Sequence, residues 1–388
     1  MKKILFLFFI LTFSSALFAQ KSAVTNFNKG REAQDLSTKL KFFNTAIDIK
    51  PNYADAYHYR GDVHKDLKQT KKALADYSNA IKFAPKDPFK YYSRAIVYFD
   101  QKKYALAIED LNNAIKYKPD FLDFYLKRGT AYLRSDKYDS AVKDFEKYSK
   151  KRKKPNTFYL DLGKAYFGIY SYAKASTQFK TFISLEPQNP EGYYQEGRIW
   201  FNDQHYDESI SWFSKAINRD DSYSAAYRMR ATAFKNISDY EQSIKDFTKL
   251  IELVPDFSYY NRRGLVYEDM GEFQKAVEDY SKAIELNPKW PIAYNNRGYV
   301  YVRLKEWAKA KEDLEKAISL EPSLPLPYVN LAGLMWLHKK DKKNTLNNLD
   351  LAMKRNFKDT NALYEEEKKG WMFKNFNNTS EFRAIIYR

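Results

Sequence analysis

A tyrosine recurs along this chain at a nearly constant spacing of 34 residues, with one step of 33. Self-similarity at such a period constrains the fold strongly, because units of this size bury their apolar faces by stacking on one another. The recurring residues are Tyr57, Tyr91, Tyr125, Tyr159, Tyr193, Tyr227, Tyr260, Tyr294 and Tyr328. We therefore expect an array of similar units along most of the chain.

Each unit contains two runs of apolar residues at helical spacing. We number the positions of a unit as slots, with the tyrosine at slot 4. A glycine or alanine follows at slot 8 and a bulky residue at slot 11, and a second run places a small residue at slot 20 and a bulky one at slot 24. Steps of three and four residues lie on one face of a helix, and the proline that often occupies slot 32 ends the second helix. The spacing predicts two helices per unit.

This pattern closely resembles the tetratricopeptide repeat, W-x₂-L-G-x₂-Y…A-x₃-F…P. The resemblance implies an all-α fold, an α-solenoid superhelix of antiparallel helix pairs. It covers residues 23–358, with units beginning at residues 23, 54, 88, 122, 156, 190, 224, 257, 291 and 325. Residues 359–388 are expected to form a C-terminal cap anchored by Trp371, Phe373, Phe376 and Phe382.

Two charged slots vary together. Slot 7 is arginine in six units, and slot 23 of the same six units is aspartate. The units beginning at Asn156 and Pro190 lack both residues. Because a guanidinium can hold a carboxylate through two hydrogen bonds, we expect a structural ion pair in each of the six units.

The first nineteen residues predict an export signal. Lys2 and Lys3 precede an apolar run that begins at Ile4, and small residues follow, so cleavage is expected after Ala16 or Ala19. An uncleaved anchor is the alternative. The expected location is therefore the periplasm or envelope, or the medium after secretion.

Composition excludes several function classes. The chain has no cysteine and only four histidines, which excludes thiol catalysis and thiolate metal sites. It has no nucleophile elbow, phosphate loop or dinucleotide fingerprint, so we expect no enzyme, no cofactor, no metal and no catalytic residue. The net charge of +17 and the basic run 147–154 favour an anionic envelope surface, acidic glycans or acidic proteins over nucleic acid, which an exported protein rarely meets.

The resemblance also implies a place for a partner. In this family, side chains at slots 2, 5, 6, 9, 12 and 13 of the first helix line a concave face that contacts extended peptides. Arginine can hold carboxylates there, asparagine can bond a peptide backbone, and aromatic rings supply contact area. The candidate partner-binding residues are Tyr194, Arg198, Phe201, Arg228, Lys235, Asn261, Arg262, Asn295, Asn296, Tyr299 and Arg303.

The residues therefore favour an exported adapter that binds an extended, acidic partner segment on the concave face. No three consecutive units carry the Lys and Asn set with which family members bind chaperone tails, so that partner is rejected. The alternative is a purely structural subunit of an envelope or secretion assembly, without a peptide groove.

Overall fold

The computed structural model describes residues 20–358, 370–373 and 376–386. These residues form helices, turns and loops without a strand, which confirms the all-α prediction. The predicted signal at 1–19 lies outside the described residues, as do 359–369 of the expected cap. Among the described residues, no helix combines the length and apolarity needed to cross a bilayer.

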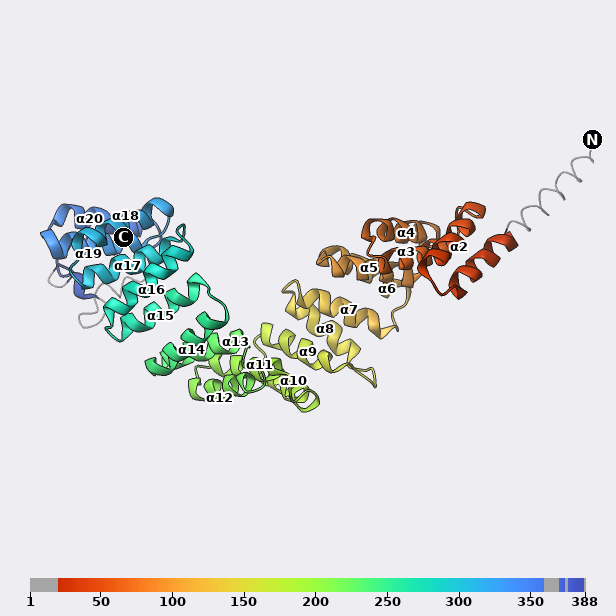
Figure 1. The fold of residues 1–388 in the computed structure, drawn as a ribbon, viewed down its shortest axis with the longest axis horizontal. Coiled ribbons are helices and arrows are strands. Elements are labelled where there is room, and N and C mark those ends of the chain that lie inside the picture. Colours follow the sequence, from red (N-terminus) through yellow and green to blue (C-terminus); the bar gives the residue numbers. More distant parts are fainter. Residues whose placement is uncertain (1–19, 359–369, 374–375, 387–388) are drawn as a thin grey trace, which may run out of the picture. The chain divides into compact units, whose positions relative to one another are not determined.

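The chain forms two compact units, Met1–Pro187 (unit 1) and Gln188–Arg388 (unit 2), between which the array expected over 23–358 is divided (Figure 1). In unit 1 a helix over 20–32 is followed by α2 (Leu36–Ile49), α3 (Ala54–Asp66), α4 (Thr70–Phe83), α5 (Pro88–Asp100), α6 (Tyr104–Tyr117), α7 (Leu122–Leu133), α8 (Tyr138–Tyr148), α9 (Asn156–Gly168) and α10 (Tyr172–Leu185).

Unit 2 continues the same alternation of first and second helices. Its elements are α11 (Pro190–Asn202), α12 (Tyr206–Ile217), α13 (Ser224–Asn236), α14 (Tyr240–Leu253), α15 (Phe257–Asp269), α16 (Phe273–Leu286), α17 (Pro291–Arg303), α18 (Trp307–Leu320), α19 (Leu326–Lys339), α20 (Lys342–Met353), a 3₁₀ turn η2 (Gly370–Phe373) and α21 (Ser380–Ile386).

Each first helix packs on the second helix of its own pair, and each pair packs on the next within a unit. The small residue at slot 8 permits this close approach. A Cβ added to Gly264 would lie 2.7 Å from the Tyr280 ring, and one added to Gly61 would lie 2.8 Å from the Tyr77 ring. Both rings are fully buried, so the space that a side chain would need at slot 8 is filled by the residue at slot 24.

The turn inside each pair has one recurring conformation. Slot 15 adopts a positive φ between 56° and 62° at Lys68, Lys102, Asp136, Tyr170, Gln204, Ser238 and Lys305, and 77° at Gly271. Of these residues, only Gly271 adopts such an angle without strain, because it has no side chain. The turn geometry is therefore imposed by packing of the two helices rather than by turn residues.

The predicted ion pairs are present in all six units that carry both residues. Nε and Nη2 of each arginine donate to the two carboxylate oxygens of the aspartate at 2.6–2.8 Å, in the pairs Arg60–Asp76, Arg94–Asp110, Arg128–Asp144, Arg230–Asp246, Arg263–Asp279 and Arg297–Asp313. Each pair joins the two helices of one repeat.

A third hydrogen bond from each arginine reaches the preceding repeat. Nη1 donates to the residue at slot 25 there, for example Ser78 from Arg94 and Thr248 from Arg263. The arginine thus connects three helices. The two repeats without it, which begin at Asn156 and Pro190, are the last of unit 1 and the first of unit 2.

Candidate functional site

The candidate partner-binding residues all lie in unit 2, on the first helices α11, α13, α15 and α17. Each first helix packs on its second helix through the side that carries slots 4, 8 and 11. Slots 5, 6, 9, 12 and 13 are therefore left on the other side, which we call the first-helix face.

The asparagines of this face bond to one another. Asn296 Nδ2 donates to Asn261 Oδ1 at 3.0 Å, and Asn295 Nδ2 donates to Asn296 Oδ1 at 3.1 Å. Asn330 Nδ2 then donates to Asn295 Oδ1 at 2.9 Å. This asparagine ladder runs across α15, α17 and α19, so much of the hydrogen-bonding capacity expected to bind a peptide backbone is used between repeats. The amide nitrogen of Asn261 and the carbonyl oxygen of Asn330 keep capacity at its two ends.

The ladder reveals a register between neighbouring first helices. It joins slot 5 of one repeat to slot 6 of the next, and His58 and Ser93 of unit 1 meet in the same way, with Nε2 and Oγ 2.7 Å apart. Arg228 at slot 5 and Arg262 at slot 6 of the next repeat occupy the corresponding positions on α13 and α15. The register therefore places two arginines at facing positions of neighbouring helices, and neither has an acidic partner among the described residues.

Arg198 lies one repeat earlier and is held within its own helix. Its Nη1 donates to Oε1 of Gln195 at 2.8 Å, and the Gln195 side chain is buried. Gln195 Nε2 in turn donates to Glu191, whose carboxylate accepts a hydrogen bond from Tyr223 of the next repeat. The Tyr194 ring packs edge-on against Tyr223 at 5.5 Å. This end of the face is an ordered polar and aromatic surface.

Acidic residues accompany the other two candidate cations. Lys235 Nζ lies 2.5 Å from the carboxylate of Asp269 on the next first helix. Burial raises the pKa of Glu268 to about 7, while the hydrogen bond from Tyr280 and the charges of Lys235 and Arg303 act in the opposite direction. The Arg303 guanidinium also lies 5.0 Å from the centre of the Phe273 ring. At slots 12 and 13 the face is therefore close to charge balance.

The other two aromatic candidates are partly buried by their own surroundings. Phe201 packs edge-on against Tyr206 at 5.4 Å, and Tyr299 packs against the apolar clusters of the last repeats. Both present only part of a ring to the first-helix face.

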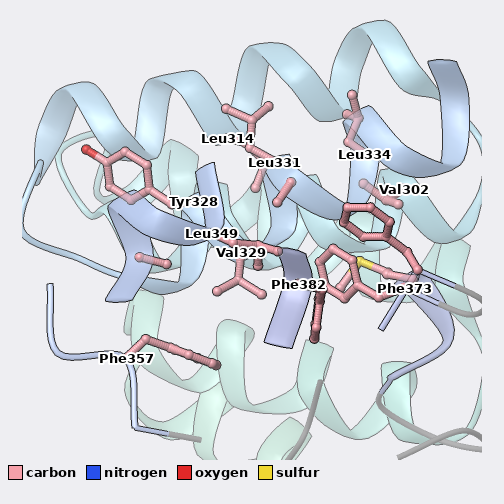
Figure 2. Packing of buried hydrophobic residues seen from close by; sticks show 14 of the residues in the cluster. Val302, Leu314, Tyr328, Val329, Leu331, Leu334, Leu349, Phe357, Phe373 and Phe382 are labelled. Carbon is pink, nitrogen blue, oxygen red and sulfur yellow. The ribbon is translucent and has the colours of Figure 1, made fainter. Parts of the chain in front are cut away.

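The C-terminal segment covers this face at α19. A Cβ added to Gly333, at slot 9, would collide with the side chain of Met372, and Trp336, at slot 12, stacks on Phe376 with ring centres 4.3 Å apart. Figure 2 shows Phe373 and Phe382 in the apolar cluster that includes Val302 and Leu349. Three of the four expected cap anchors, Phe373, Phe376 and Phe382, are thus buried, whereas the side chain of Trp371 lies outside the described residues.

The sequence reasoning missed several residues of the face. Asn330, Glu268 and Asp269 occupy slots 6, 12 and 13, and the same slot rule applied to all repeats would have included them. The position of Met372 has no periodic signal. Among the described residues, no group of three or more His, Asp or Glu side chains is arranged to hold a metal ion.

Comparisons with known proteins agree with the geometry. Sequence profiles described as tetratricopeptide repeat match residues 54–87, 160–225, 258–289 and 291–324, and one described as TPR repeat matches residues 96–136. No curated protein matches the sequence.

Several solved structures are similar to this chain. The C-terminal part of a TPR repeat-containing protein from Cytophaga hutchinsonii is 22% identical, with a TM-score of 0.54 over 62% of this chain and 99% of that one. A tetratricopeptide repeat protein from Parabacteroides merdae is 21% identical, with a TM-score of 0.48 over 69% and 98% of the two chains. YrrB, described as a TPR protein with an unusual peptide-binding site, is 18% identical, with a TM-score of 0.40 over 47% and 94%.

The profile matches fall on repeats of both units, and the helices that they cover pack in pairs around the small and bulky residues of the motif. We conclude that this chain is built of tetratricopeptide repeats.

Proposed function

We propose that the chain is an exported adapter that holds an extended, acidic segment of a partner protein against the first-helix face of unit 2. The tetratricopeptide fold supports a role as a scaffold for protein–protein interaction. Residues on one face of consecutive first helices recur in register, which suits a ligand that runs across several helices.

The observation that carries the proposal is the juxtaposition of Arg228 and Arg262. Two cations that share one register position repel each other unless an anion lies between them. At the next two positions of this register the chain supplies its own partner, Asn261 for Asn296 and Asn295 for Asn330. A carboxylate from a partner segment would complete the arginine pair through charge-assisted hydrogen bonds.

The neighbours of this pair suit an extended segment. Tyr194 lies one repeat before it and offers part of an aromatic ring, while the asparagine ladder follows on its other side and has a free amide nitrogen at Asn261. Arg198, Lys235 and Arg303 have a secondary role, because Gln195, Asp269 and Glu268 already engage or balance them. The proposed segment therefore places its acidic residue at Arg228 and Arg262.

A displayed library of random peptides tests this assignment on the full chain. We expect the wild type to enrich peptides rich in Asp and Glu, and Arg228→Ala with Arg262→Ala to weaken their binding at least tenfold without changing thermal stability. Lys245→Ala with Lys289→Ala removes the same charge from exposed positions of unit 2 that lie outside the first helices, and should leave binding unchanged. Equal enrichment of the same peptides by all three proteins would contradict the assignment.

Export is part of the proposal and has its own test. It rests on the apolar run that follows Lys2 and Lys3. Mass spectrometry of the protein isolated from its native cells should find an N-terminus at Leu17 or Gln20, in the envelope or periplasmic fraction. An intact N-terminus on protein in the cytoplasmic fraction would contradict export and leave the peptide-binding face untouched.

The second candidate is a structural subunit without a peptide groove. One observation favours it: the C-terminal segment already occupies the first-helix face at α19 through Met372 and Phe376. A structural subunit should show no selective enrichment in the library experiment. The same measurement therefore distinguishes the adapter from the structural subunit.

A further inference from the structure

The positive charge of the chain is concentrated in unit 1. Residues 20–187 contain 33 Lys and Arg against 19 Asp and Glu, whereas residues 188–388 contain 31 against 30. The candidate partner-binding residues lie in unit 2, which is almost neutral. The excess charge of unit 1 therefore has no explanation in the partner-binding face.

Part of this charge forms a periodic column. Slot 29 is lysine in three consecutive repeats. Lys82 and Lys116 lie in the last turns of α4 and α6, Lys150 lies two residues after the end of α8, and all three are exposed. None has an acidic partner among the described residues. Neighbouring residues extend the column into a surface that we call the basic ridge, made of Lys82, Lys86, Lys116, Lys118, Lys150, Arg152, Lys153 and Lys154.

Acidic residues of the adjoining turns do not neutralise the ridge. Asp87 binds Lys90, and Asp123 binds Lys151 at 2.6 and 2.8 Å. The exposed Asp120 remains as a local counter-charge. The eight cations of the ridge thus outnumber the free carboxylates beside them.

The position does not itself require a cation. A lysine in the last turn of a helix is stabilised by the helix dipole, and this effect would favour lysine at slot 29 of every repeat. In the following repeats the same slot is Ser184, Asn218, Glu252, Glu285 and Ser319. The difference between the three lysine repeats and these repeats points to a ligand of unit 1.

Exposed aromatic rings accompany the ridge. Lys82 Nζ lies 5.6 Å from the centre of the Phe83 ring, and Lys118 Nζ lies 5.6 Å from that of Phe89. Phe83 is 36% exposed and Phe89 40%. Cations beside partly exposed rings are the combination that favours the headgroup region of a bilayer, where the ring enters the interface and the ammonium group meets lipid phosphate.

We propose that the basic ridge of unit 1 binds the surface of an anionic lipid bilayer. The ridge extends over several repeats, as a ligand with a continuous anionic surface requires. Each lysine close to an anionic membrane increases the membrane partition coefficient of the protein roughly fivefold. The inference does not depend on the peptide-binding proposal, since the two use different units and different helices.

Vesicle co-sedimentation with the full chain tests the ridge. Binding to vesicles with 30% phosphatidylglycerol is compared with binding to vesicles of pure phosphatidylcholine. Binding to the neutral vesicles measures any contribution of the apolar residues 1–19. Lys82→Glu, Lys116→Glu and Lys150→Glu together should weaken binding to the anionic vesicles about 100-fold. Lys72→Glu, Lys143→Glu and Lys174→Glu make the same charge change at exposed positions earlier in second helices, and should weaken it less than fivefold. Circular dichroism should show the same thermal unfolding for all three proteins.

Three results would overturn the proposal. The first is an equal loss in the two triple variants, which would indicate attraction by net charge alone. The second is no preference of the wild type for anionic vesicles. The third is ridge-dependent binding to dextran sulfate without binding to vesicles, which would assign the ridge to a soluble polyanion.

Discussion

Arg230 donates hydrogen bonds of 2.8 and 2.7 Å to the two carboxylate oxygens of Asp246, and its third nitrogen reaches Ser214 of the preceding repeat at 2.8 Å. The Asp246 side chain is 4% exposed, so its charge depends on this arginine for compensation. The same arrangement recurs in five other repeats, and it joins helices within a repeat as well as between repeats.

Replacing this arginine should destabilise unit 2 strongly. Arg230→Leu leaves the buried carboxylate of Asp246 without a counter-charge, and we expect a loss of about 3–5 kcal/mol in the free energy of unfolding. All six tryptophans of the chain lie between residues 200 and 371, so tryptophan fluorescence in a urea titration reports unit 2 alone.

A double variant provides the control for that experiment. Arg230→Leu with Asp246→Gln copies Leu162 and Gln178, which occupy these slots in a natural repeat, and it removes the uncompensated charge. It should recover part of the lost stability. A double variant less stable than the single one would show that the pair is not coupled as described.

Gly264 predicts a second stability effect. An alanine Cβ there would lie 2.7 Å from the buried Tyr280 ring, and forcing the ring to move should cost about 1–3 kcal/mol. The matched control is Ala231→Gly, at the same slot one repeat earlier, which should lose only about 1 kcal/mol through helix propensity. Urea midpoints measure both. A Gly264→Ala variant more stable than the wild type by the full ~1 kcal/mol of helix propensity would refute the close-packing role of slot 8.

The sequence predicted the features that repeat, and it missed those that depend on register or on the chain end. First helices begin at Pro190, Ser224, Phe257 and Pro291, where the motif places slot 1. The Arg–Asp pairs followed from two slots that vary together. The asparagine ladder was not predicted, because slot 5 faces slot 6 of the next repeat only once the pairs are stacked.

Two other features could not follow from the motif. The contact between Met372 and Gly333 involves a segment with no periodicity. The acidic neighbours of Lys235 and Arg303 lie one helix away, and their proximity is set by the stagger of the first helices. The concentration of charge in unit 1, in contrast, is visible by counting residues along the chain.

The turn inside each repeat offers a stabilising substitution. Ser238 has a φ of 62°, and Gly271 occupies the same slot one repeat later with a φ of 77°. Ser238→Gly should raise the stability of unit 2 by about 0.5–1 kcal/mol, because glycine adopts this conformation without strain. Gly271→Ala should have the opposite effect. Urea titration followed by tryptophan fluorescence measures both, and a destabilised Ser238→Gly would contradict the assignment of strain to slot 15.

Glu268 predicts a dependence of stability on pH. Burial raises its pKa from 4.5 to about 7, so the folded state binds a proton more tightly than the unfolded state. The contribution of this group is therefore most favourable below pH 4.5 and falls as the pH rises to 7. Glu268→Gln keeps an acceptor for the Tyr280 hydroxyl and removes the charge. We expect it to stabilise unit 2 by up to about 3 kcal/mol above pH 7 and to have little effect near pH 4.5. A stability difference that does not change with pH would contradict the raised pKa.

The most direct test of the proposed function reverses the charge of the arginine pair. Peptides selected from a random library by the wild type are compared with those selected by the variant carrying Arg228→Glu and Arg262→Glu, after urea titration has shown that both are equally folded. If a partner carboxylate lies between these two residues, the wild type enriches acidic peptides and the variant enriches peptides rich in Lys and Arg. An acidic preference that survives the reversal, or no selection by either protein, would contradict the account.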